Sequence, residues 1–209
     1  AIVAFVDEVR PIAQEQGWQS TLADLAQTLG VFALDSGQLD EGRKLLAEGL
    51  AHARLSRDPA KIARLHRSRG FVALRYGELS TARAHYETAR DHYHMAGQPE
   101  SDSEARGGLA QVELIAEDFE AARRYNDEAV RISREGGYRI QLANHLSHRG
   151  DIAAAEGDHV TAQRFYSEAA ELARITDNQH VYPMAILNLG MALLYLGRSD
   201  EAAQHLEEA

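Results

Sequence analysis

The residues best suited to chemistry are His145, His148 and Asp151, which recur at every third position. On a helix this spacing would place two imidazoles and a carboxylate on one face, where they could ligate a transition metal. No fourth ligand accompanies them, and ten histidines in a chain of 209 residues make such spacings common by accident. We therefore expect no metal site and no cofactor.

Other signatures of catalysis are missing from the sequence. There is no cysteine, so disulfides and cysteine-ligated metals are excluded. There is also no phosphate-binding glycine loop, no nucleophile-elbow serine and no HExxH metalloprotease motif. The many Asp and Glu residues fall where solvated helix surfaces are expected. We predict a protein that is not an enzyme.

The net charge of −10 argues against a nucleic-acid partner, because phosphate binding needs a basic surface. No apolar run approaches the length that spans a membrane. The opening Ala1–Val6 is short and is followed at once by charged residues, so we interpret it as a helix face and not as a secretory signal. We expect a cytoplasmic protein.

The elements that must position any site follow from a glycine repeat with a period of 40 residues. One column, broken only by Glu117, contains Gly37, Gly77, Gly157 and Gly197. A second column, seven residues earlier and broken only by Ala110, contains Gly30, Gly70, Gly150 and Gly190. Two such columns in one register indicate a true internal repeat.

Small and bulky residues alternate in the same register. The small columns are Gly42, Ala82, Ala122, Ala162, Ala202 and Gly49, Ala89, Ala129, Ala169, Ala209. The bulky column between them is Leu46, Tyr86, Asn126, Tyr166, Leu206. Two helices of a hairpin approach closely only where side chains are absent or methyl-sized. We expect each bulky residue to pack over the glycine of the second column, and the glycines of the first column to end helices with φ > 0.

The pattern is legible in "RGFVALRYGELSTARAHYETA" (69–89), "RGDIAAAEGDHVTAQRFYSEA" (149–169) and "LGMALLYLGRSDEAAQHLEEA" (189–209). It resembles the tetratricopeptide repeat family over almost the whole chain. The resemblance implies an all-α, right-handed superhelix (an α-solenoid) of helical hairpins. The usual period of the family is 34, and the longer variant is similar to the repeats of bacterial regulators such as the MalT-like activators and the Rap-type peptide sensors.

We expect a single solenoid domain over 1–209 with repeats at 1–19 (partial), 20–59, 60–99, 100–138, 139–178 and 179–209 (truncated). The first helix of each hairpin, helix A, is predicted at 20–36, 60–76, 101–116, 139–156 and 180–196. Helix B is predicted at 38–55, 78–96, 118–135, 158–175 and 198–209. Asp58-Pro59 and a capping box at Ser101–Glu104 are expected to start helices.

Both ends of the chain fall within a repeat, which favours a fragment of a larger protein. Its uncapped apolar ends predict end-to-end self-association into a homo-oligomer.

In the family, helix A lines the concave wall and supplies the peptide contacts. The first repeat then contributes Asp24, Gln27, Thr28, Val31 and Asp35. The candidate peptide-binding residues of the later repeats are Arg64, Arg67, Phe71, Arg75, Gln111, Asn144, His148, Asp151, Asn188, Met191 and Tyr195. Three arginines around Phe71 suit an acidic segment, unless they pair with neighbouring acids. Met191 and Tyr195 suit apolar side chains, and the amides suit a peptide backbone.

Gly107-Gly108 falls on the predicted inner wall of the middle repeat. The pair either opens a pocket or marks a degenerate repeat, since both glycine columns fail there. The function that these features favour is a module that binds a protein or peptide, as the sensing or partner-binding arm of a larger bacterial regulator. The alternative is a structural oligomerisation module with no small ligand.

Overall fold

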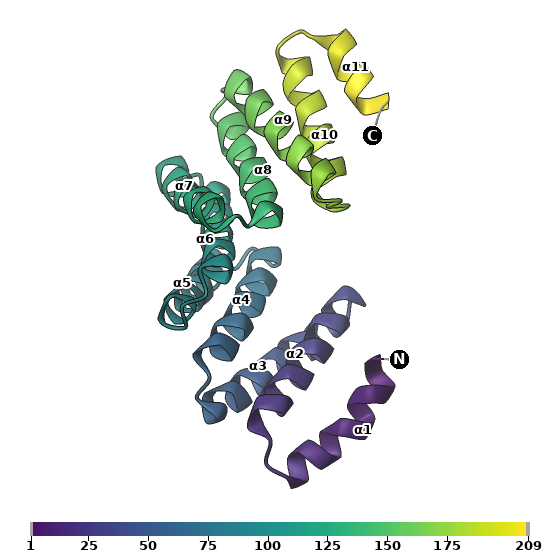
Figure 1. Ribbon diagram of the computed structural model, residues 1–209, viewed down its shortest axis with the longest axis vertical. Helices are drawn as coiled ribbons and strands as arrows, with labels where there is room; N and C mark the ends of the chain where they lie inside the picture. The colour runs from purple at the N-terminus through teal and green to yellow at the C-terminus, as the bar shows by residue number, and fades with distance from the viewer. Residues whose placement is uncertain (1, 208–209) are drawn as a thin grey trace. The chain divides into compact units, whose positions relative to one another are not determined.

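The computed structural model describes residues 2–207, with side chains at 5, 6 and 8–207, and this part of the chain is helical without strands (Figure 1). The helices are α1 Ile2–Glu15, α2 Gln19–Asp35, α3 Leu39–Ser56, α4 Pro59–Arg75, α5 Leu79–Met95, α6 Pro99–Ile115, α7 Phe119–Gly136, α8 Arg139–Ala155, α9 His159–Ile175, α10 Val181–Tyr195 and α11 Ser199–Glu207. No helix within 2–207 is long and apolar enough to cross a bilayer.

The all-α hairpin architecture predicted from the repeat is confirmed, and the helix ends lie within two residues of the prediction. Asp58 caps α4 as expected, because its carboxylate accepts hydrogen bonds from the backbone N–H of Ala60 and Lys61 at 3.0 and 3.2 Å. Ala1, Glu208 and Ala209, which the predicted helices include, lie outside the described residues.

The predicted capping box at Ser101–Glu104 is wrong. Helix α6 begins at Pro99, so Ser101 already lies inside its first turn. The physical reason is that proline suits the first helical position, where its fixed φ matches the helix and its missing N–H is not needed.

The first helix of each hairpin ends next to a residue with left-handed backbone conformation, at the positions that the glycine column predicts. Gly77 has φ 72°, and the other three glycines of the column have φ between 74° and 81°. Glu117, the residue that breaks the column, adopts the same conformation with φ 60°. The repeat therefore imposes this backbone geometry even where the side chain opposes it.

Replacing Glu117 with glycine is expected to stabilise the protein. Glu117 is exposed, and removing its Cβ relieves a left-handed penalty of about 1–2 kcal/mol, partly offset by the greater freedom of glycine when unfolded. We expect a net gain of about 0.5–1 kcal/mol in the free energy of unfolding, measured by urea denaturation. Gly77→Glu, the mirror change, should lose a similar amount. If Glu117→Gly lowered stability, the account of this turn would be wrong.

The predicted packing of bulky residues over glycines is confirmed in four repeats. A Cβ built on Gly30, Gly70 or Gly190 would lie 3.0–3.1 Å from the facing Leu46, Tyr86 or Leu206. On Gly150 it would lie 2.5 Å from a ring carbon of Tyr166. In the middle repeat both members of the pair change together, to Ala110 and the smaller Asn126. The side-chain volume removed at one position compensates for the methyl group added at the other.

Asn126 is completely buried, and its Nδ2 donates a hydrogen bond to the backbone carbonyl of His145 at 3.0 Å. A bulky apolar residue of the column is thus replaced by a polar one that binds the next hairpin. The middle repeat keeps the register of the solenoid with a different pair of residues.

The described residues form two compact units, unit 1 (1–98, α1–α5) and unit 2 (99–209, α6–α11). Within unit 1, α2 contacts α4; within unit 2, α8 contacts both α6 and α10. In the part of the chain that is described, no Cα atoms of α3 and α5, or of α7 and α9, approach within 8 Å. An ion pair between Arg134 and Glu168, 2.8 Å long, links α7 to α9. Since the backbones of successive A helices approach more closely than those of successive B helices, each unit curves with its A helices on the inner side. The prediction of a single domain over 1–209 stays a prediction.

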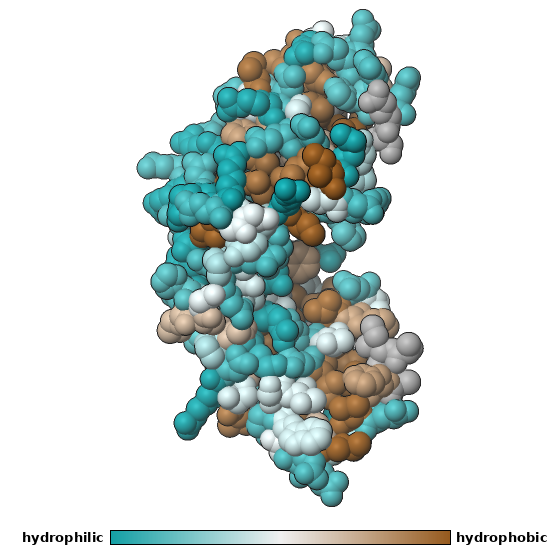
Figure 2. Space-filling model, in the orientation of Figure 1, coloured by the Kyte–Doolittle hydropathy of each residue, from teal (hydrophilic) through white to brown (hydrophobic). Residues whose placement is uncertain are grey.

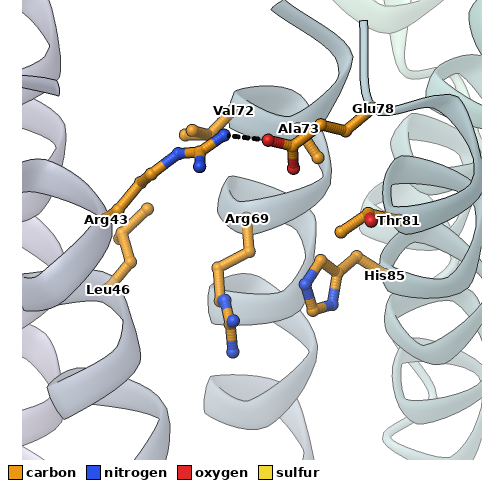
Figure 3. Close-up of a pocket in the computed structure, with 8 residues that line it drawn as sticks. All are labelled: Arg43, Leu46, Arg69, Val72, Ala73, Glu78, Thr81 and His85. Atoms are coloured by element: carbon orange, nitrogen blue, oxygen red, sulfur yellow. Dashed lines mark hydrogen bonds and ion pairs between the residues drawn. The ribbon is translucent and has the colours of Figure 1, made fainter. Parts of the chain in front are cut away.

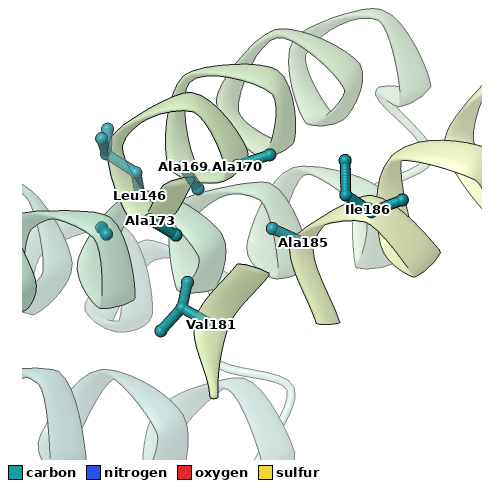
Figure 4. Packing of buried hydrophobic residues seen from close by; sticks show 8 residues of the cluster. Leu146, Ala169, Ala170, Ala173, Val181, Ala185 and Ile186 are labelled. Atoms are coloured by element: carbon teal, nitrogen blue, oxygen red, sulfur yellow. The ribbon is translucent and has the colours of Figure 1, made fainter. Parts of the chain in front are cut away.

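The core of unit 2 is dominated by alanine. In unit 2, Ala143, Ala169, Ala173 and Ala185 are fully buried where α8, α9 and α10 meet, with Leu146, Val181 and Ile186 around them (Figure 4). Methyl-sized side chains allow the three helices to approach closely. This tight packing gives the A helices the fixed geometry from which their inner side chains project.

Candidate peptide-binding faces of the two units

A groove of about 450 Å³ lies between the A helices of unit 1, α2 and α4. It is lined by Asp24, Gln27, Thr28, Val31, Phe32, Asp35 and Arg64. Five of these are the inward positions predicted for the first repeat, and Arg64 is the first candidate of the second. Val31 and Phe32 are 40% and 46% exposed, so apolar surface is available to a ligand. Figure 2 shows such apolar side chains gathered over α1 and α2.

The charges in this groove are partly neutralised by the protein itself. Asp24 forms ion pairs with both Lys61 and Arg64 of α4. The amide of Gln27 donates to the hydroxyl of Ser68 at 3.2 Å, which joins the two A helices again. Arg64 is therefore paired with a neighbouring acid, which was the alternative to recognition of an acidic ligand. Within 2–207, the carboxylate of Asp35 forms no ion pair and accepts no hydrogen bond, so it remains available to a cationic group.

Farther along α4, Phe71 and Arg75 lie together at the surface. The guanidinium carbon of Arg75 is 5.9 Å from the ring centroid of Phe71, at the outer limit of a cation–π contact. Phe71 is 50% exposed, and both residues line a pocket of about 110 Å³ with Leu34, Leu39, Val72 and Tyr76. Arg67 lies one turn before Phe71 and is half-buried. The predicted arginine cluster is thus spread along the helix, with one member paired to Asp24.

In unit 2, a cavity of about 340 Å³ is lined by Ala154, His159, Tyr166, Asn188, Met191, Ala192 and Tyr195. Three of these, Asn188, Met191 and Tyr195, are candidates of the last repeat. The Tyr195 ring stacks on His159 of α9, with centroids 4.3 Å apart and an interplanar angle of 5°. Met191 is 48% exposed and Tyr195 68% exposed. The sequence did not single out His159, since only the fold brings it to α10.

Asp151 anchors a polar network beside this cavity. It accepts hydrogen bonds from the Tyr166 hydroxyl at 2.8 Å and from Nδ2 of Asn188 at 3.1 Å. Burial raises the pKa of Asp151, while His148 and the two hydrogen bonds act in the opposite direction. The network ties α8 to α9 and α10, so these candidates hold the cavity wall in place.

The candidate amides are already engaged within unit 2. Nε2 of Gln111 lies 2.6 Å from Nε2 of His148, and Nδ2 of Asn144 donates to the carbonyl of Ile140 at 3.1 Å. Asn188 donates to Asp151, as described above. A bound peptide backbone would therefore meet amide oxygens more readily than amide N–H groups.

His145, His148 and Asp151, which have metal-ligand spacing, lie in different surroundings. His145 is buried in the core, whereas His148 and Asp151 contact residues of the inner face. His145 is 3% exposed, and its Nε2 lies 3.4 Å from the Ser103 hydroxyl of α6. The ring centroids of His145 and His148 are 6.4 Å apart. No group of three or more His, Cys, Asp or Glu side chains suited to a metal ion occurs among the described residues.

The ring of His145 explains Gly107. A Cβ on Gly107 would lie 2.7 Å from Cε1 of His145, so the glycine lets the imidazole pack against the backbone of α6. Both Gly107 and Gly108 are buried. At Gly107, the missing side chain makes room for a neighbouring core residue. Sequence reasoning missed this pairing because the two residues lie in different repeats.

Residues 141–209 match the family model of the tetratricopeptide repeat. This part of the chain is therefore similar to the tetratricopeptide repeat, the family that the glycine and alanine columns resemble. No curated protein sequence matches it significantly.

Solved structures show the same fold along the chain. BtubC (BKLC) from P. vanneervenii is 19% identical with a TM-score of 0.79, over 99% of this chain and 86% of that one. Aspartyl phosphate phosphatase F from Bacillus subtilis is 13% identical with a TM-score of 0.79, over 95% and 53%. The Rap conjugation gene regulator of the plasmid pLS20, in complex with the Phr* peptide, is 15% identical with a TM-score of 0.75, over 88% and 51%. The resemblance to Rap-type repeats is confirmed, and this chain spans about half the length of those two proteins.

Proposed function

We propose that this chain is a module that binds a protein or peptide segment on the inner faces of its A helices. The observation that carries the proposal is that each unit has a groove or cavity lined in part by residues predicted to face inward. The pLS20 regulator, whose fold is similar, is described in complex with a peptide. We further propose that the module is the sensing or partner-binding arm of a larger, cytoplasmic bacterial regulator, with no nucleic-acid or membrane partner of its own.

The chemistry of the grooves supports an extended segment with apolar side chains. Val31 and Phe32 in unit 1, and Met191 and Tyr195 in unit 2, offer exposed apolar surface beside fixed polar groups. The unpaired carboxylate of Asp35 favours a basic residue next to an apolar one. Because Arg64 is already paired with Asp24, an acidic ligand is less well matched to the unit 1 groove than the sequence suggested.

A non-catalytic role fits the placement of the perturbed titratable groups. His145 is enclosed by core contacts, and Asp151 is held by two hydrogen bonds within the protein. A general acid or base has to reach a substrate proton. The similar fold of a phosphatase-named structure does not by itself assign a reaction to this chain.

The proposal is tested by selecting ligands from a library of random linear peptides displayed on phage. A selected synthetic peptide should bind the Met191→Glu or Phe71→Glu variant at least about tenfold more weakly, because a charge would be placed against its apolar side chains. The controls are Ile175→Glu on α9 and Leu55→Glu on α3, which change apolar residues of B helices that are at least as exposed. Equal losses in control and test variants, or no selected peptide, would contradict the proposal.

The alternative is a structural module that self-associates. The observation that favours it is the apolar surface of α1, where Phe5 is 61% and Ile12 is 52% exposed. Light scattering over a range of protein concentrations separates the two functions. A mass that rises with concentration supports self-association through this surface, and a monomer at all concentrations rejects it.

A further inference from the structure

Unit 1 has a smaller cavity that shares no residue with its A-helix groove. It has a volume of about 110 Å³ and lies between α3, α4 and the beginning of α5. Figure 3 shows the residues that matter: Arg43, Leu46, Arg69, Glu78, Thr81 and His85. This cavity is too small for a peptide and has the dimensions of a few water molecules.

The only carboxylate that lines the cavity is already paired. Glu78 accepts an ion-paired hydrogen bond from Arg43 at 2.6 Å, drawn as the dashed line in Figure 3. The Arg43 guanidinium also lies over the ring of Tyr76, 4.0 Å from its centroid. Arg43 and Glu78 therefore form an ion pair at one edge of the cavity, and their charges neutralise each other.

Arg69 has no such counter-charge. Its side chain is half-buried and extends along α4 between Leu46 and His85 (Figure 3). No hydrogen bond or ion pair to Arg69 is found among residues 2–207. Burial lowers the pKa of Arg69, and the nearby Arg54 lowers it further. A cation withdrawn from water without a partner is costly, so this arrangement suits a bound anion.

Two histidines add to the excess of donors. Nδ1 of His66 lies 3.0 Å from Nδ1 of His85, and their ring centroids are 5.1 Å apart. Burial lowers the pKa of His66 to about 4, with His85, Arg54, Arg69 and His92 lowering it further. Burial and Arg69 lower the pKa of His85. The charged or titratable groups that lower the pKa values of this pair are thus all basic.

We infer that this cavity binds a phosphate group, which Arg69 holds together with the Thr81 hydroxyl and the His85 imidazole. A guanidinium presents paired N–H donors that match two oxygens of a tetrahedral oxyanion. A hydroxyl and an imidazole supply further donors from α5. The site lies outside the peptide groove and does not depend on the proposed function. The phosphate could be the free ion or the end of a phosphomonoester, because recognition at this size involves the PO₄ group alone.

The test is calorimetric titration of the whole chain with inorganic phosphate at constant ionic strength. Wild type should bind saturably, and Arg69→Gln should bind at least about tenfold more weakly, since a charged hydrogen bond is lost. Thr81→Val should lose several-fold. Lys44→Gln removes the same charge from an exposed side chain of α3 and should bind as wild type does. Without phosphate, Arg69→Gln should be at least as stable as wild type, because a half-buried charge without a counter-charge is removed.

Two further titrations define the chemical nature of the ligand. Glycerol 3-phosphate binding as tightly as inorganic phosphate would assign recognition to the phosphate group, whereas binding of the free ion alone would restrict the site to it. Sulfate, which stays dianionic, should bind more tightly as the pH falls from 7.5 to 5.5, because an anion raises the pKa of His66 and His85. The charged groups that face this pair are Arg43 and Arg54 from α3, Arg69 from α4, and Glu78 and His92 at α5. Wild type that does not bind, chloride that acts equally, or Arg69→Gln that binds normally would overturn the inference.

Discussion

Acidification from pH 7 to pH 4 should destabilise unit 2 by about 3 kcal/mol through His145 alone. Burial lowers the pKa of this imidazole to about 3, with His148 as a smaller cause. In the unfolded chain the same group titrates near 6.5. The unfolded state therefore takes up a proton that the folded state rejects, and stability is lost as the pH falls from about 6.5 towards 3.

Neighbouring groups modify this loss in opposite directions. The pKa of His148 is also lowered by burial, so protonation of the unfolded chain at His148 adds to the acid effect. The pKa of Asp151 is raised, mainly by burial. Stability from a raised carboxyl pKa is present at low pH and lost as the pH rises through the folded value, so Asp151 partly offsets the histidines.

His145→Gln isolates the contribution of His145. The variant keeps a polar side chain near Ser103 but cannot acquire a charge. Its free energy of unfolding, measured with urea at pH 7, 6, 5 and 4, should fall by about 3 kcal/mol less than that of wild type. The matched control is His180→Gln, an exposed histidine of the same unit. If His145→Gln and His180→Gln showed the same pH dependence, His145 would not be the cause.

Gly150→Ala is expected to destabilise the protein by about 2–3 kcal/mol. The new Cβ would lie 2.5 Å from Cε1 and 2.6 Å from Cδ1 of Tyr166. The ring cannot swing away freely, because its hydroxyl is bound to Asp151 and its side chain is buried. The helix propensity gained by alanine, up to about 1 kcal/mol, reduces the loss but does not cancel it.

Gly190→Ala is the matched control for this change. There the Cβ would lie 3.1 Å from the end of Leu206, a flexible and 43% exposed side chain that can move. Its free energy of unfolding should change by less than about 1 kcal/mol. The double variant Gly150→Ala/Tyr166→Leu should be less destabilised than the two single changes summed. Equal effects of Gly150→Ala and Gly190→Ala in urea denaturation would refute the steric account.

The helices and their pairing could be predicted from the sequence because they depend on patterns that every repeat shares. The 40-residue glycine columns located the left-handed turns, and the small and bulky columns located the helix contacts that Gly70 and Tyr86 make. Ala110 and Asn126 depart from the glycine column and the bulky column, but they occupy the same positions of the 40-residue repeat. Such features reflect backbone geometry and side-chain volume, which recur at fixed positions in a hairpin.

The polar contacts of the candidate site could not be predicted in the same way. The partner of Arg64 is Asp24, forty residues earlier, and the ring of His145 packs on Gly107, thirty-eight residues earlier. These residues vary from repeat to repeat, so no column records their pairing. The lack of a counter-charge at Arg69 is likewise a property of three neighbouring helices.

The sequence by itself thus determined that the chain is a series of helical hairpins, and which small and bulky residues pack where their helices meet. Only the tertiary structure decided which inner charges are already neutralised, which amides are engaged and which cation is left unpaired. The physical reason is that hairpin packing is dictated by side-chain volume at repeated positions. The electrostatics of a site depend on individual side chains brought together from different repeats.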